Sequence, residues 1–334
     1  MNTLARRLAF LPVVTALLAG ATPAARAADA EPAYEALLVA KAPAIVSVKF
    51  VLKTRFSMGG QSQDDESNAE IRGVVVDPTG LVMVANDAFD GGSSMMRTMI
   101  KQRGGELTTS PTGLVVLYGN EAVEHPAVIV ARDSTLGVAF VQVMDVEASK
   151  LPAIDLAQGA EPKIGQSLFG VTRKGRGFDC APAIDRLFVT GKIEKPRLAW
   201  SVSGAFGGMG LPVYDAGGKP VGVLSRVEAS EGVEGHGGRG GMGGMMSGLA
   251  AAAEGTCVLP LAAVQKVLEQ ARKRVPEAVA KAKEAAAPKD GDAPKAPDAP
   301  DAPKAPEAPS APDAPKAPDA PMAPDAPKAP ESPK

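Results

Sequence analysis

Short aliphatic runs with a period of two constrain the fold of this chain more than any other feature. From Val46 to Leu52 apolar side chains alternate with other residues, as on a half-buried strand. The residues Asp77 to Gly80 separate two further runs, Ile71–Val76 and Leu81–Val84, and form a turn in which proline presets φ and glycine accepts a left-handed backbone. The sequence therefore predicts a β-hairpin here, preceded by a polar loop, Arg55–Glu70.

Further runs of the same kind follow in two groups. The first group continues, after a long polar insertion (Gly91–Thr112), with strands predicted at 114–118, 126–131 and 138–143. The second group begins after Pro162 and contains strands predicted at 167–171, 187–193, 211–214, 221–225 and 257–259. Many short strands joined by Gly/Pro turns indicate an all-β fold, and two such groups favour two barrels.

Two helices flank the strands. One is predicted at Tyr34–Lys41. The other has an apolar stripe at helical spacing, made of Leu261, Val264, Val267, Leu268, Ala271 and Val275. We expect Pro276 to end or kink this second helix, because proline has no N–H to donate, and Glu277–Ala287 to be able to continue as a separate helical piece.

The N-terminus has the three parts of a secretory signal. Arg6 and Arg7 precede an apolar run, Leu8–Leu18, and Ala25-Arg26-Ala27 has the small-x-small pattern of a cleavage site. The run is short for a membrane span. We therefore expect cleavage after Ala27 and export to the periplasm, cell envelope or extracellular space, with no stable membrane insertion afterwards. An uncleaved anchor is the alternative.

The C-terminal part of the chain repeats Xaa-Ala-Pro from Pro288 onward. Proline at every third position favours polyproline II, and the near absence of large apolar side chains prevents a packed core. The predicted organisation is a signal peptide at 1–27, a helical lead-in at 28–43, a double-barrel domain with its C-terminal helix at 44–275, and a disordered Ala/Pro-rich tail at 276–334.

Charge and metal-ligating residues exclude some functions and leave others open. The net charge is −2, from 36 Lys+Arg against 38 Asp+Glu, which argues against nucleic acid as a partner. The acidic run Asp64–Glu66 is interpreted as a solvated loop and not a cation site, and no cofactor is predicted. Cys180 and Cys257 allow one disulfide or two separate buried thiols, and the spacing does not decide between them.

Methionines cluster in two loops: Met95, Met96 and Met99, and Met242, Met245 and Met246. Their thioethers are either adaptable apolar filler or soft ligands for Cu(I). No metal site is predicted from these residues, but a Met-rich metal-binding module stays as an alternative function.

Five segments in order carry a family resemblance: AIVSVKF (44–50), GVVVDPTGLVMVAND (73–87), VIVARDSTLGVAFVQV (128–143), GGMGLPVYDAGGKPVGVLS (207–225) and CVLPLAAVQKVLEQ (257–270). They resemble the first strand, the hairpin before the catalytic histidine, the strand pair with the catalytic aspartate, the nucleophile loop, and the closing strand and helix of the HtrA branch of trypsin-like serine proteases. The resemblance covers roughly 43–275 and includes no PDZ domain. It implies a chymotrypsin-like two-barrel fold whose C-terminal helix packs on the second barrel.

The same resemblance places other residues at all three positions of the catalytic triad. Asp87 stands where the histidine belongs, Gly137 where the aspartate belongs and Met209 where the serine belongs. A serine protease needs a hydroxyl nucleophile, an imidazole that takes and returns its proton, and a carboxylate that orients the imidazole. None of the three replacements supplies its part.

The neighbouring glycines Gly207, Gly208 and Gly210 are candidates for an oxyanion loop that binds an anion or carboxylate, or they form an ordinary tight loop. Ser203 and Ser201 are the nearest stand-in nucleophiles. The two histidines are unsuited to act as their base, because His125 lies on a predicted strand and His236 in a glycine-rich loop, Glu231–Gly248.

The sequence thus predicts an exported, catalytically inactive trypsin-like pseudoprotease that binds a peptide or protein ligand or acts as a scaffold. An active serine endopeptidase with non-standard residues is the alternative enzyme. The oligomeric state is left open.

Overall fold

The computed structural model describes residues 34–91, 97, 100–144, 151–157, 159–226 and 255–286. The predicted signal peptide, the glycine-rich loop and the Xaa-Ala-Pro repeat lie outside these residues. The described residues belong to one compact unit, which ends at Ala287.

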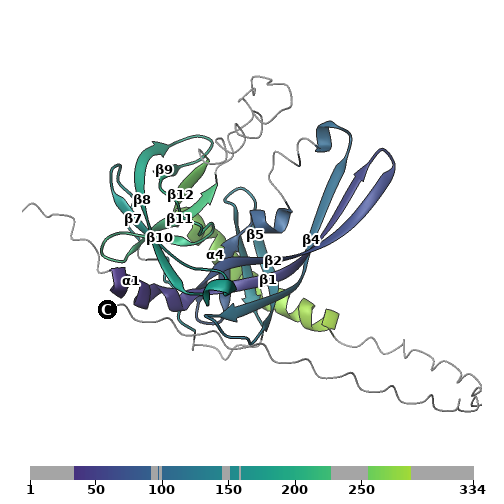
Figure 1. Cartoon of the computed structure of the whole chain (residues 1–334), viewed down its shortest axis with the longest axis horizontal. Coiled ribbons are helices and arrows are strands. Elements are labelled where there is room, and N and C mark those ends of the chain that lie inside the picture. The colour runs from purple at the N-terminus through teal and green to yellow at the C-terminus, as the bar shows by residue number, and fades with distance from the viewer. Residues whose placement is uncertain are drawn as a thin grey trace, which may run out of the picture. The chain divides into compact units, whose positions relative to one another are not determined.

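Twelve antiparallel strands form two closed barrels (Figure 1). The first barrel contains β1 (Ile45–Met58), β2 (Gln61–Asp77), β3 (Leu81–Ala85), β4 (Glu106–Tyr118), β5 (His125–Asp133) and β6 (Val138–Val143). The second contains β7 (Ser167–Arg173), β8 (Pro182–Ile193), β9 (Ala199–Ser203), β10 (Pro212–Tyr214), β11 (Pro220–Arg226) and β12 (Thr256–Pro260). The strand order β1-β2-β3-β6-β5-β4 recurs as β7-β8-β9-β12-β11-β10. The prediction of an all-β, two-barrel fold is confirmed.

Each barrel has its own apolar core, and a third core lies where the barrels and the helices meet. Strand β3 contributes side chains both to the core of its own barrel and to the core shared between the barrels. Val82 and Val84 point into the core of the first barrel, whereas Leu81 and Met83 join the shared core with Leu211 of the second barrel. Because both faces of β3 are covered, all of its residues are buried and its sequence is continuously apolar.

The predicted loop Arg55–Glu70 is wrong, because this segment is paired strand. β1 and β2 pair without interruption from Ile45↔Val74 to Met58↔Gln61. Gly59 and Gly60 form the turn with φ of 60° and 80°, which only glycine adopts without strain. The β2 half of this outer hairpin, Gln61–Asn68, is exposed on both faces and the β1 half is at most half-buried, so the side chains have no apolar period from which a strand could be predicted.

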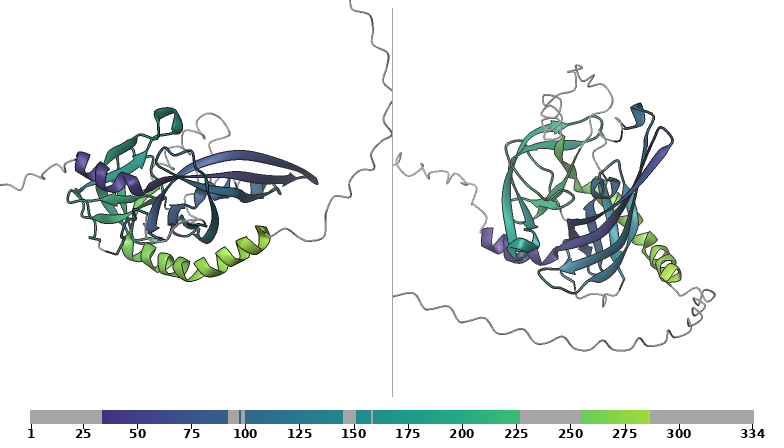
Figure 2. Two further views of the ribbon diagram at one scale, coloured as in Figure 1. Left: turned by 90° about the horizontal axis from the view of Figure 1, so that it is seen from below. Right: turned by 45° about the vertical axis from the view of Figure 1, so that its right-hand side comes forward.

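The outer part of the β1–β2 hairpin projects from the first barrel, and strand β4 adds a third strand to this projection, which we call the blade. β4 begins at Glu106, inside the predicted insertion, and pairs with the outer half of β1. The blade consists of 53–58 of β1, 61–69 of β2 and 106–112 of β4, and Figure 2 shows it extending beyond the barrel. The acidic run Asp64–Glu66 therefore lies on a strand. There Asp64 pairs with Arg55 at 2.7 Å and Glu66 with Lys53 at 2.8 Å.

The C-terminal helix corrects two expectations. α4 (Leu261–Ala286) runs through Pro276 without ending, so the segment 276–286 is helix and not tail. Proline removes one backbone hydrogen bond there, and the exposed position leaves room for its ring. α4 also packs on both barrels, through β11 and β12 of the second and β5 and β6 of the first. The other helix, α1 (Tyr34–Lys41), has the predicted bounds. None of the described helices combines the length and the apolar character needed to cross a membrane.

Candidate functional site

The Asp87 and Gly137 positions are joined by the backbone of the first barrel. Asn86, the residue before Asp87, donates its N–H to the carbonyl oxygen of Gly137 at 3.0 Å. Gly137 has a left-handed φ of 68°, and a Cβ added to it would lie 2.8 Å from the hydroxyl oxygen of Ser225, which belongs to β11 of the second barrel. The two positions therefore meet at the junction of the barrels.

The Met209 position reaches the same junction through its neighbour. Gly210 has φ of 77°, and a Cβ there would overlap the backbone nitrogen of Ala85 and lie 2.7 Å from the carbonyl carbon of Val84. Only a glycine lets the loop approach the end of β3 this closely. Because Ala85 lies two residues before Asp87, the fold brings all three triad-equivalent positions of the sequence analysis to one place.

The side chains at these positions differ in exposure. The thioether of Met209 is half-buried and packs against the apolar core of the second barrel. Asp87 is exposed and begins a single 3-10 turn, Asp87–Asp90. Gly137 has no side chain. Met209 thus acts here as an apolar anchor for its loop, a role that its sequence position alone did not reveal.

A polar network that sequence reasoning missed holds the turn Asp87–Asp90. The Asn86 side-chain amide donates to Asp90 at 3.1 Å. Arg132 of β5 donates from Nε to the Asn86 Oδ1 at 2.7 Å and from Nη2 to Asp90. Its guanidinium also lies 5.6 Å from the ring centre of Phe89. Asn86 and Asp90 are four residues apart, a spacing compatible with a local side-chain hydrogen bond, but nothing in the sequence indicated Arg132 as their partner.

The candidate stand-in residues do not form a nucleophile–base pair within the described residues. His125 begins β5 and packs edge-on against Tyr118, with ring centres 5.1 Å apart. Burial, with a smaller effect of Glu121, raises the pKa of Tyr118 to about 12. Ser201 and Ser203 lie on β9, and the Ser201 hydroxyl is 2.8 Å from that of Thr190. His236 lies outside the described residues.

The three candidate glycines of the oxyanion loop differ in whether their N–H groups are free to bind a ligand. The N–H of Gly210 donates to the carbonyl oxygen of Leu224 at 2.8 Å, so it is occupied by the fold. Gly208 is buried against the ring of Phe206, which also lies next to Gly170. A Cβ at Gly170 would lie 2.6 Å from that ring. Gly207 is exposed, and it is the candidate whose backbone best faces a ligand.

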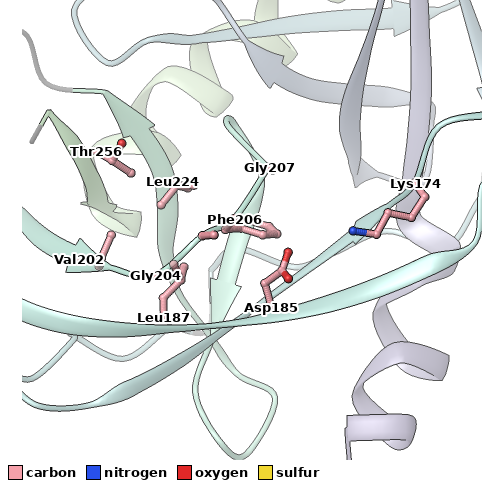
Figure 3. Close-up of a pocket in the computed structure, with 10 residues that line it drawn as sticks. Lys174, Asp185, Leu187, Val202, Gly204, Phe206, Gly207, Leu224 and Thr256 are labelled. Carbon is pink, nitrogen blue, oxygen red and sulfur yellow. The ribbon is translucent and has the colours of Figure 1, made fainter. Parts of the chain in front are cut away.

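A pocket of about 520 Å³ opens beside this loop (Figure 3). It is lined by Lys174, Asp185, Leu187, Val202, Gly204, Ala205, Phe206, Gly207, Leu224 and Thr256. The aliphatic side chains form one wall, and the charged groups of Lys174 and Asp185 lie on the side of Phe206. No ion pair joins these two side chains, so both charges are available to a bound molecule.

The first barrel helps to hold this pocket. Arg72 of β2 donates from Nη2 to the backbone carbonyl oxygen of Lys174 at 2.8 Å and from Nε to that of Arg173 at 3.0 Å. Arg173 in turn donates to the carbonyl oxygens of Ala42 at 2.9 Å and Ile45 at 3.1 Å. The charged end of the pocket is therefore fixed to both barrels.

The cysteines and methionines give no site in the described residues. Cys180 and Cys257 are both buried, and no disulfide joins them. Cys257 lies on β12, where it pairs with Ser201 of β9. Cys180 has a left-handed φ of 49° and follows the 3-10 turn Arg176–Phe178. The fold therefore places the two cysteines in different surroundings. Among the described residues no group of three His, Cys, Asp or Glu could hold a metal ion. The six clustered methionines lie outside these residues.

Comparison with known families identifies the type of domain in which these positions lie. Residues 72–223 match the family model described as the trypsin-like peptidase domain. The matched segment runs from β2 to β11 and contains Asp87, Gly137 and Met209. No curated protein matches the chain.

Proposed function

Since residues 72–223 match the trypsin-like peptidase domain, we propose that this protein is an exported, non-catalytic peptide-binding member of that class. The observation that carries the proposal is the convergence of Asp87, Gly137 and Met209 at the junction of the barrels. In a serine protease this junction holds the reacting groups. Here it holds an exposed carboxylate, a bare backbone and a thioether.

The chemistry of the three side chains does not support acyl transfer by a serine mechanism. The Met209 thioether has no proton to lose and is turned toward the core of the second barrel. The Asp87 carboxylate lacks the imidazole nitrogens that relay a proton near neutral pH. Without these groups, residual transition-state binding accelerates hydrolysis only about 10³–10⁴-fold over water, too little for an ordinary assay to detect.

The pocket beside Gly207 supports the binding role. Its aliphatic wall, with Leu187 and Leu224, can bury an apolar part of a peptide side chain. Lys174 and Asp185 can pair with a polar group of the same peptide. Binding a peptide here requires none of the missing catalytic groups, because recognition and chemistry are separate properties of a site.

Proteolysis assays test the loss of catalysis. The mature protein is incubated with casein and with a fluorescent peptide library, with and without a fluorophosphonate. We expect no turnover and no labelling by the fluorophosphonate. Turnover that the inhibitor abolishes would show that a serine such as Ser203 has been recruited, and would overturn the proposal.

A pair of tryptophan variants tests the binding role. Ala205 is exposed and lines the pocket, so Ala205→Trp should block it without disturbing a core. Ala216 is exposed in the turn between β10 and β11, and Ala216→Trp is the matched control. Peptides selected from an immobilised library should lose affinity for the first variant about tenfold or more and keep it for the second. Equal affinity for both variants would place binding elsewhere.

A further inference from the structure

The blade carries two open sheet edges. Within the barrels every strand has a neighbour on each side. Beyond the barrel, β2 pairs with β1 alone over 61–70, since its pairing with β3 begins only at Gly73. β4 likewise pairs with β1 alone below Val115. Each of these edges presents backbone N–H and C=O groups that no neighbouring strand satisfies.

The two edges differ in how they are protected. β4 carries Pro111, which has no N–H, and Gly113 with a left-handed φ of 60°. Both interrupt a regular ladder and are common devices that keep an edge from pairing. The edge of β2 from Gln61 to Asn68 contains no proline, no glycine and no lysine, and all eight of its residues are exposed. The β2 edge is therefore open to an added strand.

The side chains of this edge select the kind of strand that fits. Asp64, Asp65 and Glu66 lie at its centre, with no basic residue on the same strand segment. Arg55 and Lys53 pair with two of them from β1, and both ion pairs are exposed. Asp65 has Thr54 as its cross-strand neighbour on β1. A strand added outside β2 thus meets a row of acidic and amide side chains without an apolar face.

A second copy of this edge is a poor occupant. In an antiparallel register centred on Asp65, Asp65 would lie opposite Asp65 and Asp64 opposite Glu66. Like charges directly opposite on a sheet are destabilising. A segment with Lys or Arg at these positions forms favourable cross-strand pairs instead.

From these features we propose that the outward edge of β2, Gln61–Asn68, binds an extended basic polypeptide segment as an added antiparallel strand. Backbone hydrogen bonds supply the affinity, and the acidic centre selects the charge, as in recognition by strand addition. This surface is separate from the pocket residues, so it stands or fails independently of the proposed function.

Amide exchange in the full-length protein tests the proposal. The probe is a capped peptide of alternating Lys and Val, and its counterpart replaces every Lys by Glu. On binding of the Lys peptide, the amides of every second residue of Gln61–Asn68 should slow in exchange by about tenfold or more, because only those N–H groups face the new strand. The Glu peptide should change none of them. Uniform or absent protection with the Lys peptide would overturn the proposal.

A matched pair of charge reversals separates strand addition from general attraction. Asp65→Lys lies on the β2 edge and Glu106→Lys on β4, and both are exposed on the same blade. The first should weaken the Lys peptide about tenfold, and the second should leave its affinity within about twofold. Equal weakening would mean that only the overall charge of the blade attracts the peptide. Alternating protection that rises with protein concentration without peptide would identify a second copy as the occupant and contradict the proposal.

Discussion

The hydroxyl group of Ser225 donates a hydrogen bond of 2.7 Å to the carbonyl oxygen of Leu136. Ser225 belongs to β11 of the second barrel, and Leu136 precedes Gly137 in the turn between β5 and β6 of the first. The bond therefore connects the two barrels at the point where the triad-equivalent positions meet, and Ser225 is almost fully buried there.

Replacing Ser225 by alanine should lower the free energy of unfolding by about 1–2 kcal/mol, because the part-buried carbonyl group of Leu136 loses its side-chain donor. Urea denaturation measures the change. Ser62→Ala on the exposed part of β2 is the control and should stay within about 0.5 kcal/mol of the parent. Equal stability of the two variants would show that the bond between the barrels contributes nothing.

Gly210→Ala should destabilise the protein by several kcal/mol, since its Cβ would overlap the backbone of β3. Gly119→Ala is the matched control. Gly119 has a similar φ of 58°, but a Cβ there meets nothing within 4 Å, so it reports only the backbone strain of about 1–2 kcal/mol. If both variants unfold at the same denaturant concentration, Gly210 does not pack closely against the backbone of β3.

Leu268→Asp should cost several kcal/mol, because it places a charge in the core between the barrels, where Leu268 is 4% exposed. Lys266→Asp changes an exposed position of the same helix and should have little effect. Thermal unfolding of the two variants makes the comparison. A small loss for Leu268→Asp would mean that α4 detaches easily from the barrels.

The contribution of Asp77 to stability should depend on pH. Burial raises the pKa of this carboxyl group, but hydrogen bonds from the Thr79 amide and hydroxyl, and the ion pair with Arg272, outweigh burial and hold the pKa below its ordinary value. A lowered pKa in the folded state adds stability above the unfolded pKa of about 4, and this stability is lost as the pH falls through the folded pKa.

The difference in unfolding free energy between the parent and Asp77→Asn should therefore have its largest value above about pH 5 and shrink as the pH falls below about 4. Urea denaturation across this range measures it. Arg272→Met, which removes the ion pair but keeps the Thr79 bonds, should show a smaller pH dependence. A difference that stays constant with pH would contradict the role of the charge.

Export is predicted from the segments at Arg6–Arg7, Leu8–Leu18 and Ala25–Ala27. Mass spectrometry of the protein isolated from its native source should find Ala28 as the N-terminal residue. Lysine substitution of Leu11 and Leu17 should interrupt the apolar run and keep the chain uncleaved. Finding Met1 on the parent protein inside the cell would refute the prediction.

Local sequence patterns determined most of the elements that are buried on at least one face. The helix Tyr34–Lys41 and the strand Val138–Val143 have the predicted bounds, and the hairpin around Asp77–Gly80 has the predicted turn. The blade escaped prediction because its side chains are exposed or only half-buried, so pairing within the sheet leaves no apolar period in its sequence. β9 was missed, and α4 runs past Pro276 because packing on both barrels outweighs one lost hydrogen bond.

The three triad-equivalent positions could be aligned from the sequence, because each lies in a short motif with its own strands and turn. That they meet is decided by the tertiary structure alone. It depends on contacts between segments far apart in the chain: Asn86 with Gly137, Ala85 with Gly210, and Leu136 with Ser225. Backbone hydrogen bonds and the close approach of a glycine leave no mark on residue spacing, so only the closed barrels show which distant segments share one site.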